Sequence, residues 1–276
     1  MKKIKAIIAW EDWMLDFKWF GVLIAFTAIV LLGASVSMAH AEEAAEEKKA
    51  ILTGTLEFGA YNKYVGVTSG ATDYNHSVAQ PAIGLSHEPT GIYVKLWDSY
   101  SPHGHQDSGD EVDYIIGITR DIKGFKVDFG YAYYDLAMIG HSKGDLHAIY
   151  LNVDTPSVLT ITPFISLERD IPVNKEVLDG GMLWRIGIKR DVDVFKQAFN
   201  LNLSVAGNDG AYGTRPELVS SARFTVATTV NIYGGLTVTP SINFQKNLGY
   251  SVANGGLTQN KIYGGFLFSW SFDIIM

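Results

Sequence analysis

The sequence predicts an all-β protein, a twelve-stranded antiparallel up-and-down transmembrane β-barrel preceded by an N-terminal signal peptide. Three observations support this prediction. Apolar and polar residues alternate with a period of two from Ile51 to the end of the chain, as they do in strands with two different faces. An apolar run near the N-terminus ends in a small-residue cleavage pattern. Finally, the connections between the alternating runs are in turn long and short, as in transmembrane barrels.

The first 41 residues form a separate element with the pattern of a signal peptide. The run "FGVLIAFTAIVLLGASVSMAHA" is apolar and closes on Ala39-His40-Ala41. The segment before it is long and carries acidic residues, so either translation starts at Met14 or the n-region is extended. We therefore predict a signal peptide at 1–41, a charged lead-in at 42–50 and a transmembrane barrel at 51–276.

The composition excludes several classes of function. The chain has 276 residues and no cysteine, which removes disulfides, thiolate metal sites and cysteine nucleophiles. Its formal net charge is −7, so it has no basic surplus to neutralise phosphates and nucleic acid is not an expected partner. Charged residues make up only 18%, below the roughly 25% of soluble domains.

The C-terminal run "KIYGGFLFSWSFDIIM" shows the alternation most clearly. Phe266, Phe268, Trp270 and Phe272 fall on one face, while the other face becomes polar towards its end. A soluble barrel would bury such a face inside, whereas a transmembrane barrel turns it towards lipid. Several alternating runs reach ten residues or more, which is enough to cross a bilayer at a tilt. We therefore expect outer-membrane lipid to cover this face.

The connections divide into two groups that would lie at opposite ends of the barrel. Both termini would then lie at the end with the short turns. The six long connections are expected around 67–76, 100–110, 136–144, 170–180, 206–216 and 247–260. The five short turns are expected around 88–91, 122–124, 154–158, 191–197 and 231–235.

The stretch from "GAYNKYVGVTSG" through "AQPAIGLSHEPTGIYVKLWDS" to "DEVDYIIGITRDIKGFKVDFGYAYYD" resembles the "putative porin" family of proteobacterial outer-membrane proteins. The resemblance is clearest over residues 52–135. It is carried by Gln80, Pro81, Ala82, Gly91, Tyr93, Trp97, Ser99, Glu111, Asp113, Tyr114 and Gly117.

This resemblance implies an outer-membrane barrel of a Gram-negative bacterium, inserted by the barrel-assembly machinery, with no established substrate or catalytic residues. The chain departs from the family at one point. Such barrels usually end on an aromatic residue that the assembly machinery reads, whereas this chain continues through "DIIM" after Phe272.

Strand parity predicts which charged side chains face the lumen. Four are acidic and six are basic, so we expect weak ion selectivity. Two interpretations stay open: a water-filled pathway for small hydrophilic solutes, or a lumen closed by its own ion pairs in a barrel that displays its outer loops. The predicted pore-lining residues are Glu57, Lys63, Lys95, Asp113, Lys126, Asp128, Glu168, Arg185, Lys189 and Arg223.

The loops offer little catalytic chemistry, and we expect neither enzymatic activity nor a cofactor. In "GHSKG", His141 and Ser142 are adjacent and would point to opposite sides of an extended strand, which makes a lipid hydrolase the weaker alternative. In "SPHGHQDSGDE", His103 and His105 have the spacing of a metal-binding pair, although the Gly-rich context favours a plain polar loop.

Overall fold

The computed structural model describes residues 52–66, 72–74, 76–101, 110–136, 145–175, 180–211, 217–248 and 261–274. The predicted signal peptide at 1–41 and the lead-in at 42–50 lie outside these ranges. Within the described ranges, no helix is long and apolar enough to cross a membrane.

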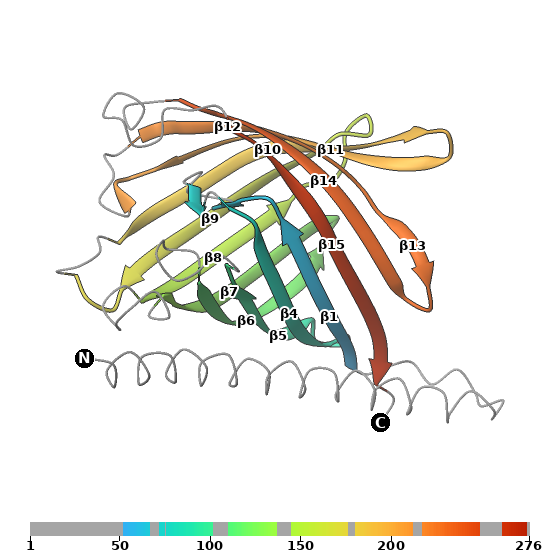
Figure 1. Ribbon diagram of the computed structural model, residues 1–276, viewed down its shortest axis with the longest axis horizontal. Coiled ribbons are helices and arrows are strands. Elements are labelled where there is room, and N and C mark those ends of the chain that lie inside the picture. Colours follow the sequence, from blue (N-terminus) through green and yellow to red (C-terminus); the bar gives the residue numbers. More distant parts are fainter. Residues whose placement is uncertain are drawn as a thin grey trace, which may run out of the picture. The chain divides into compact units, whose positions relative to one another are not determined.

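The described chain consists of strands, which Figure 1 labels in chain order. Twelve long strands build one large sheet, and three short strands accompany them. The long strands are β1 (Leu52–Tyr61), β4 (Val78–His87), β5 (Ile92–Ser99), β6 (Glu111–Ile122), β7 (Phe125–Asp135), β8 (Leu146–Asp154), β9 (Thr162–Pro172), β10 (Gly181–Val194), β11 (Gln197–Asn208), β12 (Glu217–Thr228), β14 (Leu236–Asn247) and β15 (Lys261–Ile274). The short strands are β2 (Tyr64–Val65), β3 (Thr72–Tyr74) and β13 (Val230–Tyr233).

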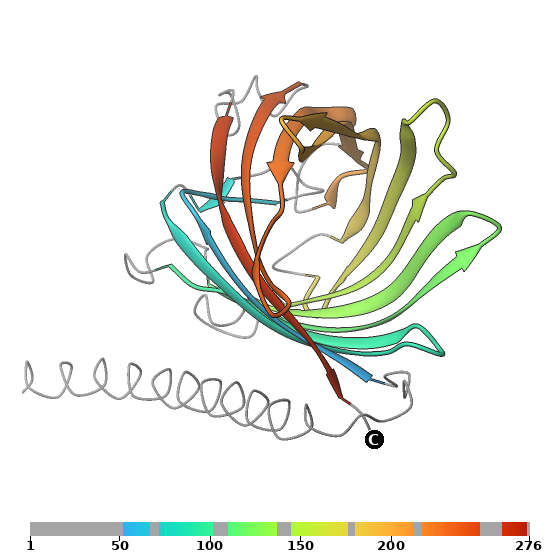
Figure 2. The same cartoon turned by 90° about the vertical axis from the view of Figure 1, so that its right-hand side faces the viewer.

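The sheet closes on itself, so the long strands have no unpaired edge. Each long strand pairs antiparallel with its neighbours, and β1 pairs with both β4 and β15. The first and last strands therefore lie side by side, as Figure 1 shows, with Phe58 opposite Phe268. Pairing of β12 with β14 completes the ring, and Figure 2 shows the strands curving into a wall. The predicted twelve-stranded antiparallel barrel is confirmed.

The three short strands were not expected from the sequence. The pair β2–β3 forms a separate two-stranded sheet within the first long connection. Strand β13 follows β12 after Thr229 and continues the pairing along β14. Runs of two to four residues are too short to show a periodicity, so alternation could not indicate them.

The long and short connections alternate as the sequence predicts. Leu52 at the start of β1 pairs with Ile274 at the end of β15, so both termini of the barrel lie at the short-turn end. Four short turns have positive φ at both central residues, for example Lys123–Gly124 (53° and 85°) and Phe195–Lys196 (52° and 67°). Such turns match the right-handed twist of the strands that they join.

The two faces of the barrel wall differ in chemistry. Residues paired directly across a ladder share a face. Lys95 and Glu57 meet over the intervening strand β4, as long side chains can do on the concave side of a curved wall, so the face that carries them is the concave one. The opposite face carries large apolar side chains with high exposure, for example Ile116 (51%), Phe129 (51%), Ile186 (50%) and Leu203 (52%). The predicted alternation is confirmed, with the apolar face on the outside, where a soluble barrel would not place it.

Candidate functional site

The concave face carries most of the residues predicted to line a pore. Nine of the ten lie on barrel strands with the parity of this face. Lys63 lies between β1 and β2, so strand parity does not apply to it. Lys126 is on the concave face but is exposed at the beginning of β7, next to a short turn. Five of the remaining eight fall into three groups along the wall, and the other three, Asp113, Glu168 and Arg223, lie near the long-loop end.

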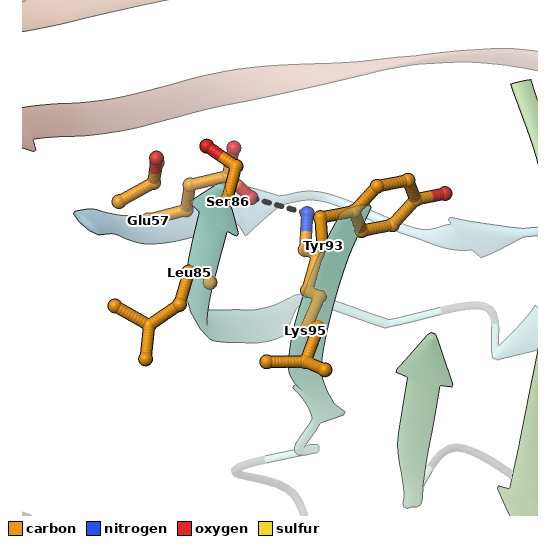
Figure 3. A pocket seen from close by; sticks show the side chains of 8 residues that line it. Glu57, Leu85, Ser86, Tyr93 and Lys95 are labelled. Carbon is orange, nitrogen blue, oxygen red and sulfur yellow. Dashed lines mark hydrogen bonds and ion pairs between the residues drawn. The ribbon is translucent and has the colours of Figure 1, made fainter. Parts of the chain in front are cut away.

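The first group is an ion pair between β1 and β5. Lys95 Nζ lies 2.6 Å from Glu57 Oε2, and both side chains are partly accessible. Figure 3 shows the two side chains pointing towards each other beside Tyr93. The strand between them, β4, presents Ala82 and Gly84 at this level, which leaves room for the pair. A hollow of about 150 Å³ accompanies it and is lined by Thr55, Glu57, Gly84, Leu85, Ser86, Tyr93, Val94 and Lys95.

The second group is a hydrogen-bond network centred on Asp128. Its Oδ1 accepts from the Tyr93 hydroxyl at 2.8 Å and from the Thr119 hydroxyl at 3.3 Å. Its Oδ2 accepts from Asn152 Nδ2 at 3.1 Å. The Tyr93 hydroxyl also contacts that of Tyr150, so the network joins β5, β6, β7 and β8. Three donors on one carboxylate fix the position of the Asp128 side chain on the wall.

Two glycines make room for the tyrosines of this network. A Cβ atom at Gly117 would lie 2.6 Å from the Tyr93 hydroxyl oxygen, closer than atoms can pack. Gly130 stands in the same relation to Tyr150. Both glycines share the concave face with these rings, so the rings lie along the wall over positions that have no side chain.

The third group surrounds Phe164 on β9. Arg185 and Lys189 on β10 both lie over its ring, with Cζ 5.2 Å and Nζ 4.9 Å from the centroid. Lys189 Nζ also donates to Asp154 Oδ1 at 2.7 Å. One aromatic ring and one carboxylate thus hold two cations against the wall by cation–π attraction and charge pairing.

Near the long-loop end, acidic and basic side chains lie on different strands. The acidic side chains are Glu111 and Asp113 on β6 and Glu168 on β9, where Glu168 accepts from Tyr134 at 3.4 Å. Opposite them, Arg223 on β12 donates to Gln245 Oε1 through Nε at 3.0 Å and Nη2 at 2.7 Å. The lumen is therefore lined by acidic and basic side chains, an arrangement suited to contacting polar solutes and ions.

Several residues of these groups were not singled out from the sequence. Tyr93 and Asn152 have the parity of the concave face, so the alternation predicts that they face the lumen. It does not predict that both bind the same partner, Asp128. Asp154 stands at the end of β8 and was assigned to a turn. Tyr64, which donates to Glu111 Oε2 at 2.7 Å, lies in a loop where no periodicity points to it.

The loop residues considered for other chemistry lie outside the described part of the chain. This applies to His103 and His105, which have the spacing of a metal-binding pair but were expected to form a plain polar loop, and to His141 and Ser142 of the hydrolase alternative. In the described ranges, no group of three or more His, Cys, Asp or Glu side chains is arranged to hold a metal ion.

Comparison with known proteins supports the architecture. No protein-family model and no curated protein matches the sequence. Among solved structures, the KdgM porin matches with a TM-score of 0.50 and 7% identity over 79% of this chain and 99% of the porin. The NanC porin matches with a TM-score of 0.47 and 9% identity, and LpxR from Salmonella typhimurium with 0.41 and 11%; they cover 79% and 78% of this chain, and each is itself covered to 99%. At these identities the likeness concerns the fold, which is that of a porin-like barrel.

Proposed function

We propose that this protein is an outer-membrane channel of a Gram-negative bacterium that allows small hydrophilic solutes to diffuse passively. The observation that carries the proposal is the opposite chemistry of the two faces of one closed barrel. The outer face exposes large apolar side chains, while the inner face carries ion pairs, carboxylates and guanidinium groups. Lipid can cover the apolar outer face, and water can fill the polar inside. The closed ladder also leaves no unpaired backbone edge in contact with lipid.

Two further elements complete this proposal. The predicted signal peptide at 1–41 would direct export, and the barrel-assembly machinery would insert the mature chain. The shared fold with the KdgM porin, in which this chain covers 99% of that porin, agrees with such a role. Weak ion selectivity is part of the proposal, because the ten predicted pore-lining residues include four acidic and six basic ones, so neither sign dominates that set.

Liposome swelling tests the passage of solutes. Liposomes that contain the refolded mature chain should swell in isosmotic solutions of small sugars and amino acids, at rates that fall as the solute becomes larger. A protein-free control and a control with a heat-denatured preparation define the background. Swelling no faster than in these controls, from a chain shown to be folded and inserted, would contradict the proposal.

A closed barrel that binds a partner through its outer loops is the second candidate. The observation that favours it is that two ion pairs, Glu57 with Lys95 and Asp154 with Lys189, join strands on the inner wall. If solutes of every size fail to pass through the folded, inserted protein in the swelling assay, this alternative is supported. In both cases the role is not catalytic; lipid hydrolysis that disappears on Ser142→Ala would show otherwise.

A further inference from the structure

We propose that the segment Tyr64–Gly66 folds into the mouth of the barrel and forms its constriction, held by Glu111 on one wall and Arg223 on the opposite wall. This inference builds on the proposed channel function and identifies the residues that set its size limit. It assigns a role to a segment that lies outside the twelve barrel strands.

One end of the segment is fixed to β6 and β5. The Tyr64 hydroxyl donates to Glu111 Oε2 at 2.7 Å, and a hydrogen bond to a carboxylate is stronger than one between neutral groups. The Tyr64 ring also packs on Trp97 of β5, with centroids 5.9 Å apart and planes inclined by 52°. Trp97 and Glu111 both have the parity of the concave face, so Tyr64 reaches the inside of the wall.

The other end of the segment is fixed to β12. Arg223 Nη2 donates to the backbone oxygen of Gly66 at 2.8 Å. The same guanidinium group is held by Gln245 and lies 5.6 Å from the Tyr263 ring centroid, so its position is set before it meets the segment. An arginine with its fork fixed in this way loses little further freedom on forming the bond.

The two attachment points lie on opposite sides of the ring. In the closed strand order, β6 and β12 are six steps apart in either direction. A segment bonded to both must cross the lumen rather than follow the rim. Val65, between the two contacts, is only 5% exposed, although an apolar side chain at an open barrel mouth would face water. The wall residues Val78 (3%), Ser99 (0%) and Gln245 (2%) are similarly covered.

Labelling of a single introduced thiol tests the position of the segment without requiring transport. The natural chain has no cysteine, so Val65→Cys creates the only thiol. In detergent-folded protein this thiol should react about tenfold more slowly with a water-soluble maleimide than Glu88→Cys, an exposed position at a short turn, because protection reports burial. Adding Tyr64→Phe or Arg223→Gln should increase the rate. Adding Arg185→Gln, which removes the same charge from a side chain that lies over Phe164 instead, should not increase the rate.

Conductance in planar bilayers then tests the functional consequence. If the segment is the constriction, Tyr64→Phe and Arg223→Gln should raise single-channel conductance by about twofold and admit larger polyethylene glycols, while Arg185→Gln changes ion selectivity without changing that size limit. A thiol in Val65→Cys alone that reacts as fast as that in Glu88→Cys would overturn the inference. So would a conducting channel whose size limit is the same in all variants, and the channel function would then survive alone. Absence of current together with slow labelling of Val65→Cys would instead refute the channel function. The segment would then close the barrel rather than narrow it.

Discussion

Glu57 and Lys95 form an ion pair across an intervening strand, with Lys95 Nζ 2.6 Å from Glu57 Oε2. Strand β4 separates them and presents only Ala82 and Gly84 at this level, so two long side chains can meet above it. The Lys95 side chain remains 33% exposed and the Glu57 side chain 23% exposed, which places the pair in contact with water. The pair is therefore expected to influence ions in the lumen more than it stabilises the wall.

Neutralising one member of this pair should change ion selectivity in a direction set by its sign. Lys95→Gln leaves Glu57 unbalanced and should favour cations, whereas Glu57→Gln should favour anions. The double variant should return close to wild type. Because the pair is partly exposed and screened by salt, each change should alter the free energy of unfolding by no more than about 1 kcal/mol. Reversal potentials in a potassium chloride gradient measure the selectivity, and a shift of the same sign in both single variants would refute this assignment.

Adding a methyl group at Gly117 should destabilise the barrel. A Cβ atom there would lie 2.6 Å from both the hydroxyl oxygen and the ring carbon Cζ of Tyr93, so the tyrosine must leave its place in the network. Overpacking of this kind typically costs roughly 1–3 kcal/mol. Denaturant unfolding in detergent, followed by tryptophan fluorescence, measures the change.

Gly84→Ala is the matched control for this substitution. Gly84 also lies on the concave face, but its nearest neighbour to an added Cβ would be the Val94 backbone oxygen at 3.6 Å, an ordinary contact. Its unfolding midpoint should stay close to wild type. If Gly84→Ala and Gly117→Ala destabilise equally, the loss of glycine in a strand rather than the contact with Tyr93 is responsible.

Adjacent residues on β11 should respond oppositely to a new charge. Leu203 is 52% exposed on the apolar face, and arginine at the midplane of a transmembrane barrel costs about 2–4 kcal/mol. Asn202 is its neighbour on the polar face, so Asn202→Arg should fold with little loss. Heat-modifiable migration on gels compares the folded fractions. Equal folding of Leu203→Arg and Asn202→Arg would contradict the placement of the two faces.

The network around Asp128 should behave as a unit. Tyr93→Phe removes the donor at 2.8 Å and the contact with Tyr150, which should cost about 0.5–1.5 kcal/mol. Asp128→Asn keeps the shape but weakens three hydrogen bonds. In a double-variant cycle the two losses should be less than additive, because both break the same bond. Strict additivity in equilibrium unfolding would show that the two residues do not interact.

The barrel was predictable from the sequence because its signal is local and repeated. In every long strand a period of two places residues such as Phe268 outside and Ser269 inside, and the lengths of the connections fix the order of the strands. The parity of the lumen charges followed from the same rule, which is why Glu57, Asp128 and Arg185 fall on the concave face. The expected strand count and the direction of the apolar face needed no long-range information.

The partners of these charges were not predictable, since they depend on how far neighbouring strands are offset. Lys95 meets Glu57 across two ladders, and Tyr93 meets Tyr150 across three strand steps. Alternation along one strand contains neither offset. The position of Tyr64 in the mouth could not be predicted either. It depends on contacts with Glu111 and Trp97, which are distant in sequence, and Tyr64 itself is not part of an alternating run.

Single-channel recording of the refolded mature chain in a planar bilayer tests the central claim most directly. A lumen lined by ion pairs and carboxylates should hold water and ions, so the account predicts discrete conductance steps that increase with salt concentration, with a small reversal potential in a salt gradient. Circular dichroism and heat-modifiable migration would first establish that the protein is folded. Absence of current from such a folded, inserted preparation would contradict the channel and leave a closed barrel.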